Sequence, residues 1–519
     1  MEWDAAYDAI LVGGGIGSLA AAIRMTERGL RPLIVEKSSS VGGASAYSGG
    51  VVWAPNNHRM RAKGLADSTE EALDYLQRVS LGRGDERIAR AYVETIPEVL
   101  EWLERRTAIV WMSYPRLPDY FAEISGGKHD GRCVLPQSRL ITGALDRARE
   151  EHEELALVRP SVHFLTESGI WAAGRGLAGC LWLRVLEDET SYELDTRVTS
   201  LISCDGEVKG VEVQGPGGRR AIAAKLGVLL NTGGFEWNRR MTRASVPATA
   251  LYPQTPPGSD GDGHTMAALL GADLALMDQT IWMPGVRVPG ERNEEEQLCR
   301  LCFQELTLPH SILVNRRGER FANETFFQDI ARGWCEFDST DASYPNLPMY
   351  FVFDDEYRRR YGLPASVPLG SYLTRHDTLG ELAERHTIDP DRLAAQVARF
   401  NADADAGRDR QFARGATAYQ RAFTDGGDGG NPTLGAIRSS PYYCMEIFPG
   451  TSGHRGGMVC DEEGRVLDVE GEWIRGLYAC GSAAAGLVTG GSYLTGTSLG
   501  HALVFGTRAA DAMTAAVAA

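Results

Sequence analysis

The chain has 519 residues, and at about 100–200 residues per domain this length predicts two to four domains. Hydrophobic residues make up 43% and charged residues 24%, which is typical of a globular protein. The formal net charge of −16 repels phosphate backbones, so nucleic acid is not expected as a partner. Because no apolar run reaches about 18 residues, no transmembrane segment is expected either.

The first residues and the cysteines indicate a cytoplasmic protein. Residues 1–4 lack the positive charge of a secretory signal. The nine cysteines are scattered except for Cys299 and Cys302, a lone CxxC that is weak evidence for zinc. We therefore expect reduced thiols, no metal site and a cytoplasmic location.

The chain begins with the pattern of a βαβ unit. Residues 7–12 are mostly apolar and end in glycines, as a buried parallel strand does. Residues 16–28 have helical spacing, and 33–35 form a second short strand. Further along, alternation over 196–213 around Asp205-Gly206 predicts a hairpin, and 228–230 is another buried strand.

The composition changes between about 282 and 437, where acidic runs and prolines accompany two helical stretches, 379–385 and 391–404. Residues 425–431 are rich in Gly and Asp and indicate a loop or hinge. After about 440 the glycine-rich, strand-like pattern returns and ends in a helix over 499–514.

These patterns predict an α/β fold made of a Rossmann-type domain with an inserted α+β domain. The predicted boundaries give residues 1–281 and 438–519 to the nucleotide-binding domain and 282–437 to the inserted domain.

A glycine-rich turn joins the first strand to the first helix. Gly13 allows the tight turn, and Gly15 lets a pyrophosphate approach the backbone at the positive end of the helix. Gly17 follows, and Ser18 replaces the third glycine with another small residue. Glu36 ends the second strand, where a carboxylate can accept hydrogen bonds from a ribose. The alternative is a glycine-rich turn without a ligand, but strand, helix, strand and acid all fall in order.

This unit fits NAD as well as FAD. The next segment, 42–50, is a second loop of small residues that can pass close to a phosphate or a flat ring system, which favours FAD.

Several further motifs follow in a fixed order. They are 42–57, Asn231-Thr232-Gly233-Gly234-Phe235, Gly261-Asp262-Gly263, Arg320-Phe321-Ala322-Asn323-Glu324, Gly456-Gly457, 476–481 and 491–500. With these motifs nearly the whole chain resembles the flavoprotein family of fumarate reductases and 3-ketosteroid dehydrogenases, and 42–57 looks most like the ketosteroid Δ1-dehydrogenase branch.

The resemblance implies that both terminal portions bind FAD and that the inserted domain caps the substrate. The residues expected to contact the cofactor are Gly13, Gly15, Gly17, Ser18, Glu36, Lys37, Gly43, Ala44, Ser45, Ser48, Gly49, Gly50, Thr232, Gly233, Gly481, Ser498 and Leu499. One branch of the family attaches flavin through a histidine in the small-residue loop. Since no histidine precedes His58, non-covalent FAD is expected.

Tyr493 is the first catalytic candidate. The resemblance implies that it donates a hydrogen bond to a substrate ketone, together with the amide of Gly496, as an oxyanion hole for the enolate. Thr495 stands where the Δ4-(5α)-dehydrogenase form has a hydroxyl. The alternative role for Tyr493 is packing against the flavin.

The base is less clear. Tyr120, in Pro118-Asp119-Tyr120, resembles a stretch that carries a catalytic tyrosine in Δ1-dehydrogenases. The region 326–328 has no tyrosine where the family has a second one. Arg455 could hold the charge of a reduced flavin or a substrate carboxylate, and His454 and Arg455 could instead be solvated surface side chains.

Three functions remain in comparison. The first is FAD-dependent α,β-desaturation of a cyclic ketone, with an external electron acceptor. The second is a fumarate reductase-type ene reductase; that branch places an arginine in the carboxy-terminal block, and 490–503 contains none. The third is a non-catalytic flavin or electron-transfer subunit, against which the hydroxyl-rich cluster after Tyr493 argues.

Overall fold

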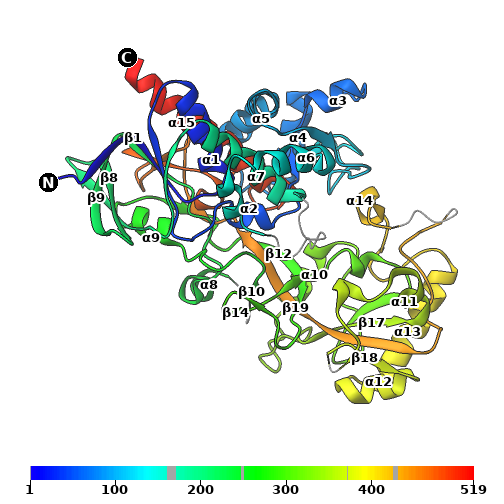
Figure 1. Ribbon diagram of the computed structural model, residues 1–519. Coiled ribbons are helices and arrows are strands. Elements are labelled where there is room, and N and C mark those ends of the chain that lie inside the picture. Colours follow the sequence, from blue (N-terminus) through cyan, green and yellow to red (C-terminus); the bar gives the residue numbers. More distant parts are fainter. Residues whose placement is uncertain (1, 161–170, 247–250, 371, 425–429, 519) are drawn as a thin grey trace. The chain divides into compact units, whose positions relative to one another are not determined.

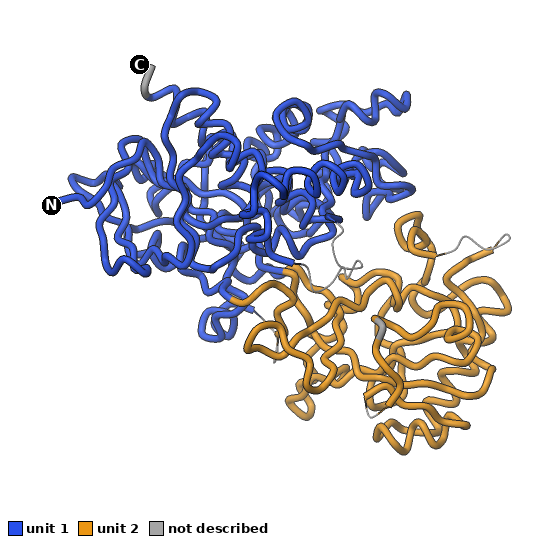
Figure 2. The backbone as a smooth tube through the Cα atoms, in the orientation of Figure 1, with its two compact units in different colours: residues 1–246, 258–280, 453–519 blue, residues 247–257, 281–452 orange. Residues whose placement is uncertain are grey.

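The computed structural model describes residues 2–160, 171–246, 251–370, 372–424 and 430–518. The chain divides into two compact units, shown in Figure 2. Unit 1 consists of Met1–Val246, Gly258–Thr280 and Gly453–Ala519, and unit 2 of Pro247–Pro257 and Ile281–Ser452. The division into a flavin domain and a capping domain at 281/282 and 437/438 stays a prediction. The predicted hinge at 425–431 lies mostly outside the described residues.

Unit 1 starts with the predicted βαβ unit (Figure 1). Strand β1 (Ala5–Val12), helix α1 (Ile16–Glu27) and strand β2 (Pro32–Val35) follow one another, and β1 and β2 pair in parallel. The last four residues of β1 and all of β2 are buried, as their apolar sequences require. The prediction for this segment is confirmed.

The parallel sheet of unit 1 has the order β22 (Trp473–Ala479), β9 (Gly218–Leu230), β1, β2 and β6 (Ser191–Glu193). The predicted hairpin is confirmed as β7 (Arg197–Cys204) and β8 (Glu207–Gly215), with Asp205-Gly206 between them. The chain end returns to this sheet through β22, so both terminal portions build one core.

Helix α15 (Thr497–Ala518) packs against α1, and it starts two residues before its predicted beginning. The crossing is close, because a Cβ at Gly506 would lie 2.5 Å from the carbonyl oxygen of Gly17. Further helices of unit 1 are α2 (Gly43–Tyr47), α3 (His58–Ala62), α4 (Thr69–Val79), α5 (Glu86–Arg106), α6 (Ser138–Ala148), α7 (Ala173–Glu187), α8 (Arg239–Ser245) and α9 (Asp262–Ala268). A small antiparallel sheet adds β3 (Val52–Trp53), β5 (Cys133–Pro136) and β4 (Trp111–Ser113).

Unit 2 is built on a largely antiparallel sheet. Its order is β15 (Arg300–Leu301), β12 (Thr280–Val286), β19 (Tyr442–His454), β17 (Met349–Asp354) and β16 (Ser311–Asn315), with β10 (Tyr252–Pro253) and β18 (Thr374–His376) paired to β19. Its helices include α10 (Phe327–Trp334), α11 (Asp355–Tyr361), α12 (Leu379–His386), α13 (Pro390–Asp405) and α14 (Ala418–Arg421). Helices α12 and α13 confirm the two predicted helical stretches. The predicted fold class, a Rossmann-type α/β unit with an inserted α+β unit, is confirmed.

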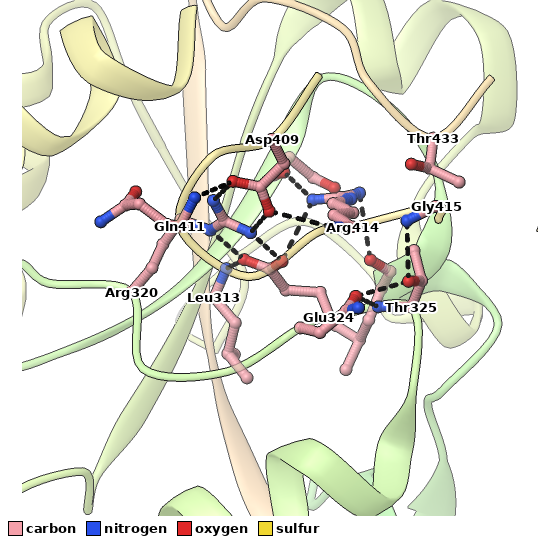
Figure 3. A network of polar contacts seen from close by, with 12 residues as sticks. Leu313, Arg320, Glu324, Thr325, Asp409, Gln411, Arg414, Gly415 and Thr433 are labelled. Carbon is pink, nitrogen blue, oxygen red and sulfur yellow. Dashed lines mark hydrogen bonds and ion pairs between the residues drawn. The ribbon is translucent and has the colours of Figure 1, made fainter. Parts of the chain in front are cut away.

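A buried ion cluster lies inside unit 2 (Figure 3). The guanidinium of Arg320 donates to the carboxylates of Glu324 and Asp409 over 2.6–3.1 Å, and all three side chains are fully buried. Arg414 lies 3.6 Å from Glu324 and donates to backbone carbonyls, among them that of Ser311. The 320–324 motif therefore ties the 409–415 segment to the core of unit 2.

Among the helices in the described part of the chain, none is long and apolar enough to cross a bilayer.

Candidate active site

The glycine-rich turn of unit 1 passes over the end of β9. Gly13 has φ +99°, and a Cβ there would lie 2.4 Å from the carbonyl oxygen of Asn231. A Cβ at Gly15 would lie 2.9 Å from Asn231 Nδ2, and one at Gly17 would lie 2.7 Å from the sulfur of Cys480. Close packing of the chain therefore requires glycine at Gly13 and Gly17, whereas at Gly15 the tight contact is the end of the Asn231 side chain.

Glu36 is held at the carboxyl end of β2. Its two carboxylate oxygens accept hydrogen bonds from the amides of Gly14 (2.7 Å) and Ser38 (2.8 Å). Next to it, Lys37 Nζ lies 3.0 Å from Asp260 and 2.8 Å from Asp262. The Glu36 carboxylate is thus fixed where the ribose is expected, and the Lys37 ammonium has two carboxylate partners.

The 42–50 segment contains a short helix, α2, where a loop was expected. Small residues let the chain make one helical turn after Gly42, which has φ +97°. Ala46 and Tyr47 are buried, while Ser45 and Ala44 remain accessible. Contacts between α2 and α7 fix the buried face. The predicted cofactor residues of α2 thus lie on its accessible side.

Gly49 and Gly50 continue the same segment. The hydroxyl of Ser48 donates to the carbonyl of Ser45 (2.7 Å) and accepts from the amide of Gly50 (3.1 Å). This local network keeps the end of the segment in one conformation.

Asn231 was not among the predicted cofactor residues, although it begins the Asn-Thr-Gly-Gly-Phe motif. It is 9% exposed, and its buried Nδ2 has no partner in the described residues. The buried hydroxyls of Ser18 and Thr232 likewise have none there. The Asn231 amide lies beside Gly15, and the Thr232 hydroxyl lies beside Gly263. Buried polar atoms are normally paired, so these unpaired atoms fit a polar group that the chain itself does not supply. Gly233, with φ +76°, turns the chain directly after them. A polar part of FAD, when bound, would supply these partners.

The carboxy-terminal segment packs against Asn231. A Cβ at Gly481 would lie 2.8 Å from Asn231 Oδ1. Further on, the carbonyl of Gly496 accepts from the amide of Trp53 at 3.2 Å, and a Cβ at Gly496 would lie 2.5 Å from the same nitrogen. The turn before α15 therefore lies against β3, and Ser498 and Leu499 form the first turn of α15.

Tyr120, Tyr493 and Thr495 are brought together. The hydroxyl of Tyr120 lies 2.5 Å from Thr495 Oγ1, and either atom can be the donor. The rings of Tyr120 and Tyr493 meet edge to face with centroids 6.4 Å apart. Burial raises the pKa of Tyr493, whereas hydrogen bonds involving the Gly496 amide and the Ser498 side chain lower it. The Gly496 amide and the Tyr493 hydroxyl thus face one another.

A buried ion pair supports the Tyr120 segment, and the sequence analysis did not identify it. Asp119 accepts from Trp53 Nε1 and from Arg132, each at 2.8 Å. Arg132 also pairs with Asp67 at 2.7 Å, and both Arg132 and Asp119 are at least 95% buried. This network fixes Tyr120 and β3 against each other. Its sequence signal was weak, because Arg132 belongs to none of the motifs.

His454 and Arg455 are buried, so the solvated surface alternative is wrong for both. The ring of His454 stacks on Phe235 with centroids 3.8 Å apart, and burial lowers its pKa to about 3. Arg455 donates to Thr489 Oγ1 at 2.8 Å and to the carbonyls of Gly486 and Gly490.

An open hollow in unit 1 is lined in part by His454 and Arg455. Its other lining residues are Gly481, Ser482, Ala484, Gly486, Val488, Thr489, Thr497, Ser498 and His501. The lining contains predicted cofactor residues and the first turn of α15. No group of three or more His, Cys, Asp or Glu side chains suited to a metal occurs among the described residues.

Phe326 and Phe327, which stand where the family has its second tyrosine, are buried in unit 2. Phe327 packs edge to face on Phe303.

Comparisons with known proteins agree with this arrangement. The model of the FAD binding domain family matches residues 8–499. The chain is 34% identical to 4-oxocyclohexanecarboxylate 2-dehydrogenase of Sinomonas cyclohexanicum, covering 96% of this chain and 91% of that one. It is 32% identical to 3-oxosteroid 1-dehydrogenase of Mycobacterium tuberculosis, covering 97% of each.

A solved structure is similar over its full length. The 3-ketosteroid Δ1-dehydrogenase of Sterolibacterium denitrificans, in complex with 1,4-androstadiene-3,17-dione, superimposes with a TM-score of 0.89 at 31% identity, over 98% of this chain and 100% of that one. The chain therefore belongs to the FAD-binding flavoprotein family that contains the 3-ketosteroid dehydrogenases.

Proposed function

We propose that the chain uses non-covalently bound FAD to desaturate a cyclic ketone between its α and β carbons. Two relatives that match nearly the whole chain are named as dehydrogenases of an oxosteroid and of an oxocyclohexanecarboxylate. This favours desaturation over the ene reductase alternative and over a non-catalytic flavin subunit. When bound, FAD supplies the acceptor for the β-hydrogen and its electron pair.

The observation that carries the proposal is the meeting of Tyr120, Thr495 and Tyr493 in unit 1. Tyr493 donates to the ketone oxygen, which stabilises the enolate that forms as the α-proton leaves, and the Gly496 amide supports this donor through its hydrogen bond to the Tyr493 hydroxyl. Tyr120 in its tyrosinate form takes that proton, and the Thr495 hydroxyl, 2.5 Å away, stabilises the tyrosinate by donating a hydrogen bond to it. A tyrosine with a pKa near 10 needs such a partner to act at neutral pH.

The position of the first histidine in the sequence supports non-covalent attachment of FAD. No histidine precedes His58, and the His58 ring lies 2.9 Å from Glu104, outside the small-residue segment. A cytoplasmic location stays a prediction.

The test is a panel of cyclic ketones, including a 3-oxosteroid, a plain cyclohexanone and a 4-oxocyclohexanecarboxylate, assayed with an artificial electron acceptor. Anaerobic addition of the right ketone should bleach the bound flavin without any reductant, and mass spectrometry should show a product lighter by two hydrogens. The reductase would be favoured instead if no ketone bleached the flavin and if chemically reduced enzyme were reoxidised only by unsaturated carboxylates. Acid precipitation should release free FAD into the supernatant.

A further inference from the structure

Arg455 is a buried cation without a counter-ion. Its side chain is 6% exposed, and its recorded partners are the neutral oxygens of Gly486, Thr489 and Gly490. In the described part of the chain no carboxylate lies within ion-pair distance of its guanidinium. A buried charge costs several kcal/mol unless an opposite charge compensates it, so Arg455 calls for an anion that the chain itself does not provide.

Two other buried arginines of this protein are compensated in this way. Arg132 has Asp67 and Asp119, and Arg320 has Glu324 and Asp409. Arg455 is buried like these two arginines, but it borders an open hollow where they have carboxylate partners.

A second positive element faces the same hollow. Thr497 and Ser498, which begin α15, line it together with Arg455. The first amides of a helix have no intrahelical acceptor, and a helix of this length carries a partial positive charge at that end. A guanidinium and a helix N-terminus thus converge on one space that Gly481, a predicted cofactor residue, also borders.

We propose that Arg455 is a positioning residue whose charge, together with the start of α15, stabilises the anionic reduced form of the bound flavin. The inference rests on FAD binding as proposed above. It favours the flavin over a substrate carboxylate, because Gly481 and Ser498, which line the hollow, are among the residues expected to hold the cofactor.

An opposite charge within a few ångströms typically changes the stability of an ionised group by about 10- to 1000-fold. Loss of the Arg455 charge should therefore weaken the reduced form relative to the oxidised form by about tenfold or more. For a two-electron couple, a tenfold change equals a fall of about 30 mV in midpoint potential.

The test uses the FAD-loaded enzyme without substrate. Arg455→Gln removes the charge and keeps an amide that can donate to the same carbonyls, and Arg455→Lys keeps the charge. Two quantities are measured, the midpoint potential and the affinity for sulfite. Sulfite forms a bond to flavin N5 with its own lone pair, and the two electrons leave a negative charge on the ring, so its binding reports on a nearby cation without turnover.

Arg475→Met is the matched control. It also removes one positive charge from unit 1, but Arg475 is exposed and donates to the backbone carbonyl of Asp205 at 2.9 Å. Arg455→Gln should lower the midpoint potential by about 30 mV or more and the sulfite affinity by about tenfold or more. Arg455→Lys should restore most of each, and Arg475→Met should leave both close to wild type.

Several outcomes would overturn the inference. One is an unchanged potential and sulfite affinity in Arg455→Gln with full flavin content. Another is a loss confined to the binding of a ketocarboxylate, with neutral ketones unaffected, which would make Arg455 a substrate clamp. If Arg455→Gln does not fold, the wild-type protein still decides, because a flavin without a nearby cation should bind sulfite poorly. Absence of FAD from the wild-type protein would instead refute the proposed function.

Discussion

The hydroxyl of Tyr120 lies 2.5 Å from Oγ1 of Thr495, although 375 residues separate the two in the sequence. The sequence analysis named both residues on separate motifs and could not say that they touch. Their contact places a threonine hydroxyl beside Tyr120, whereas residues 326–328, where the family has its second tyrosine, belong to unit 2.

If the two residues act as one base, their effects on turnover should not add. Tyr120→Phe and Thr495→Val should each slow desaturation, and the double variant should be little slower than the slower single variant. The measurement is the rate of flavin bleaching by a saturating ketone in all four proteins. Fully multiplicative effects would show that Tyr120 and Thr495 work independently.

Tyr493→Phe should lower turnover by about 10²–10³, the usual loss when one oxyanion donor is removed. The bond is stronger to the enolate than to the ketone, so substrate affinity should fall much less than turnover. Flavin content should stay normal because the ring and its packing remain. Near wild-type turnover with bound flavin would show that Tyr493 only packs against the cofactor.

The βαβ unit, the hairpin and the terminal helix were predictable because they are local. Alternation, helical spacing and turn residues are visible within about 20 residues of sequence. Helix α2 was missed because one turn of small residues has no period long enough to detect. The Asp67–Arg132–Asp119 network and the neighbours of Arg455 were missed for another reason. A charged residue gives no sign in the sequence of whether tertiary packing will bury and pair it.

Asn231→Ala should weaken FAD binding with little effect on the stability of the FAD-free protein. Its Nδ2 has no partner among the described residues, so the expected loss is one hydrogen bond to the cofactor, about 0.5–1.5 kcal/mol or 2- to 10-fold in affinity. FAD titration of the FAD-free protein measures it. Asn401→Ala is the control. That amide pairs with the backbone of Ile437, so stability should fall while FAD affinity stays.

Acid should destabilise unit 1 through its buried histidines. Burial lowers the pKa of His501 to about 4 and that of His454 to about 3, below the value near 6.5 of an unfolded chain. The unfolded state therefore binds more protons below pH 6.5, so stability is present above that pH and is lost as pH falls toward 4. Melting temperatures between pH 7.5 and 4.5 measure this loss, and His501→Gln should reduce its slope. An unchanged slope in that variant would contradict the assignment.

The buried cluster of unit 2 predicts a large difference between two Glu→Gln changes close together in the sequence. Glu324→Gln leaves the buried guanidinium of Arg320 with Asp409 as its remaining carboxylate in the cluster and deprives Arg414 of its nearest one (Figure 3). Removing one partner from a buried network typically costs about 3–5 kcal/mol.

Glu319→Gln is the matched control, because Glu319 pairs with Arg392 at 2.9 Å on the surface, where both side chains are about half exposed. A surface pair contributes about 0–1 kcal/mol. Urea unfolding followed by tryptophan fluorescence should show a clear fall in the midpoint for Glu324→Gln and almost none for Glu319→Gln. Equal small shifts of the midpoint in both variants would mean that the ion pairs of the 320–324 motif do not stabilise unit 2.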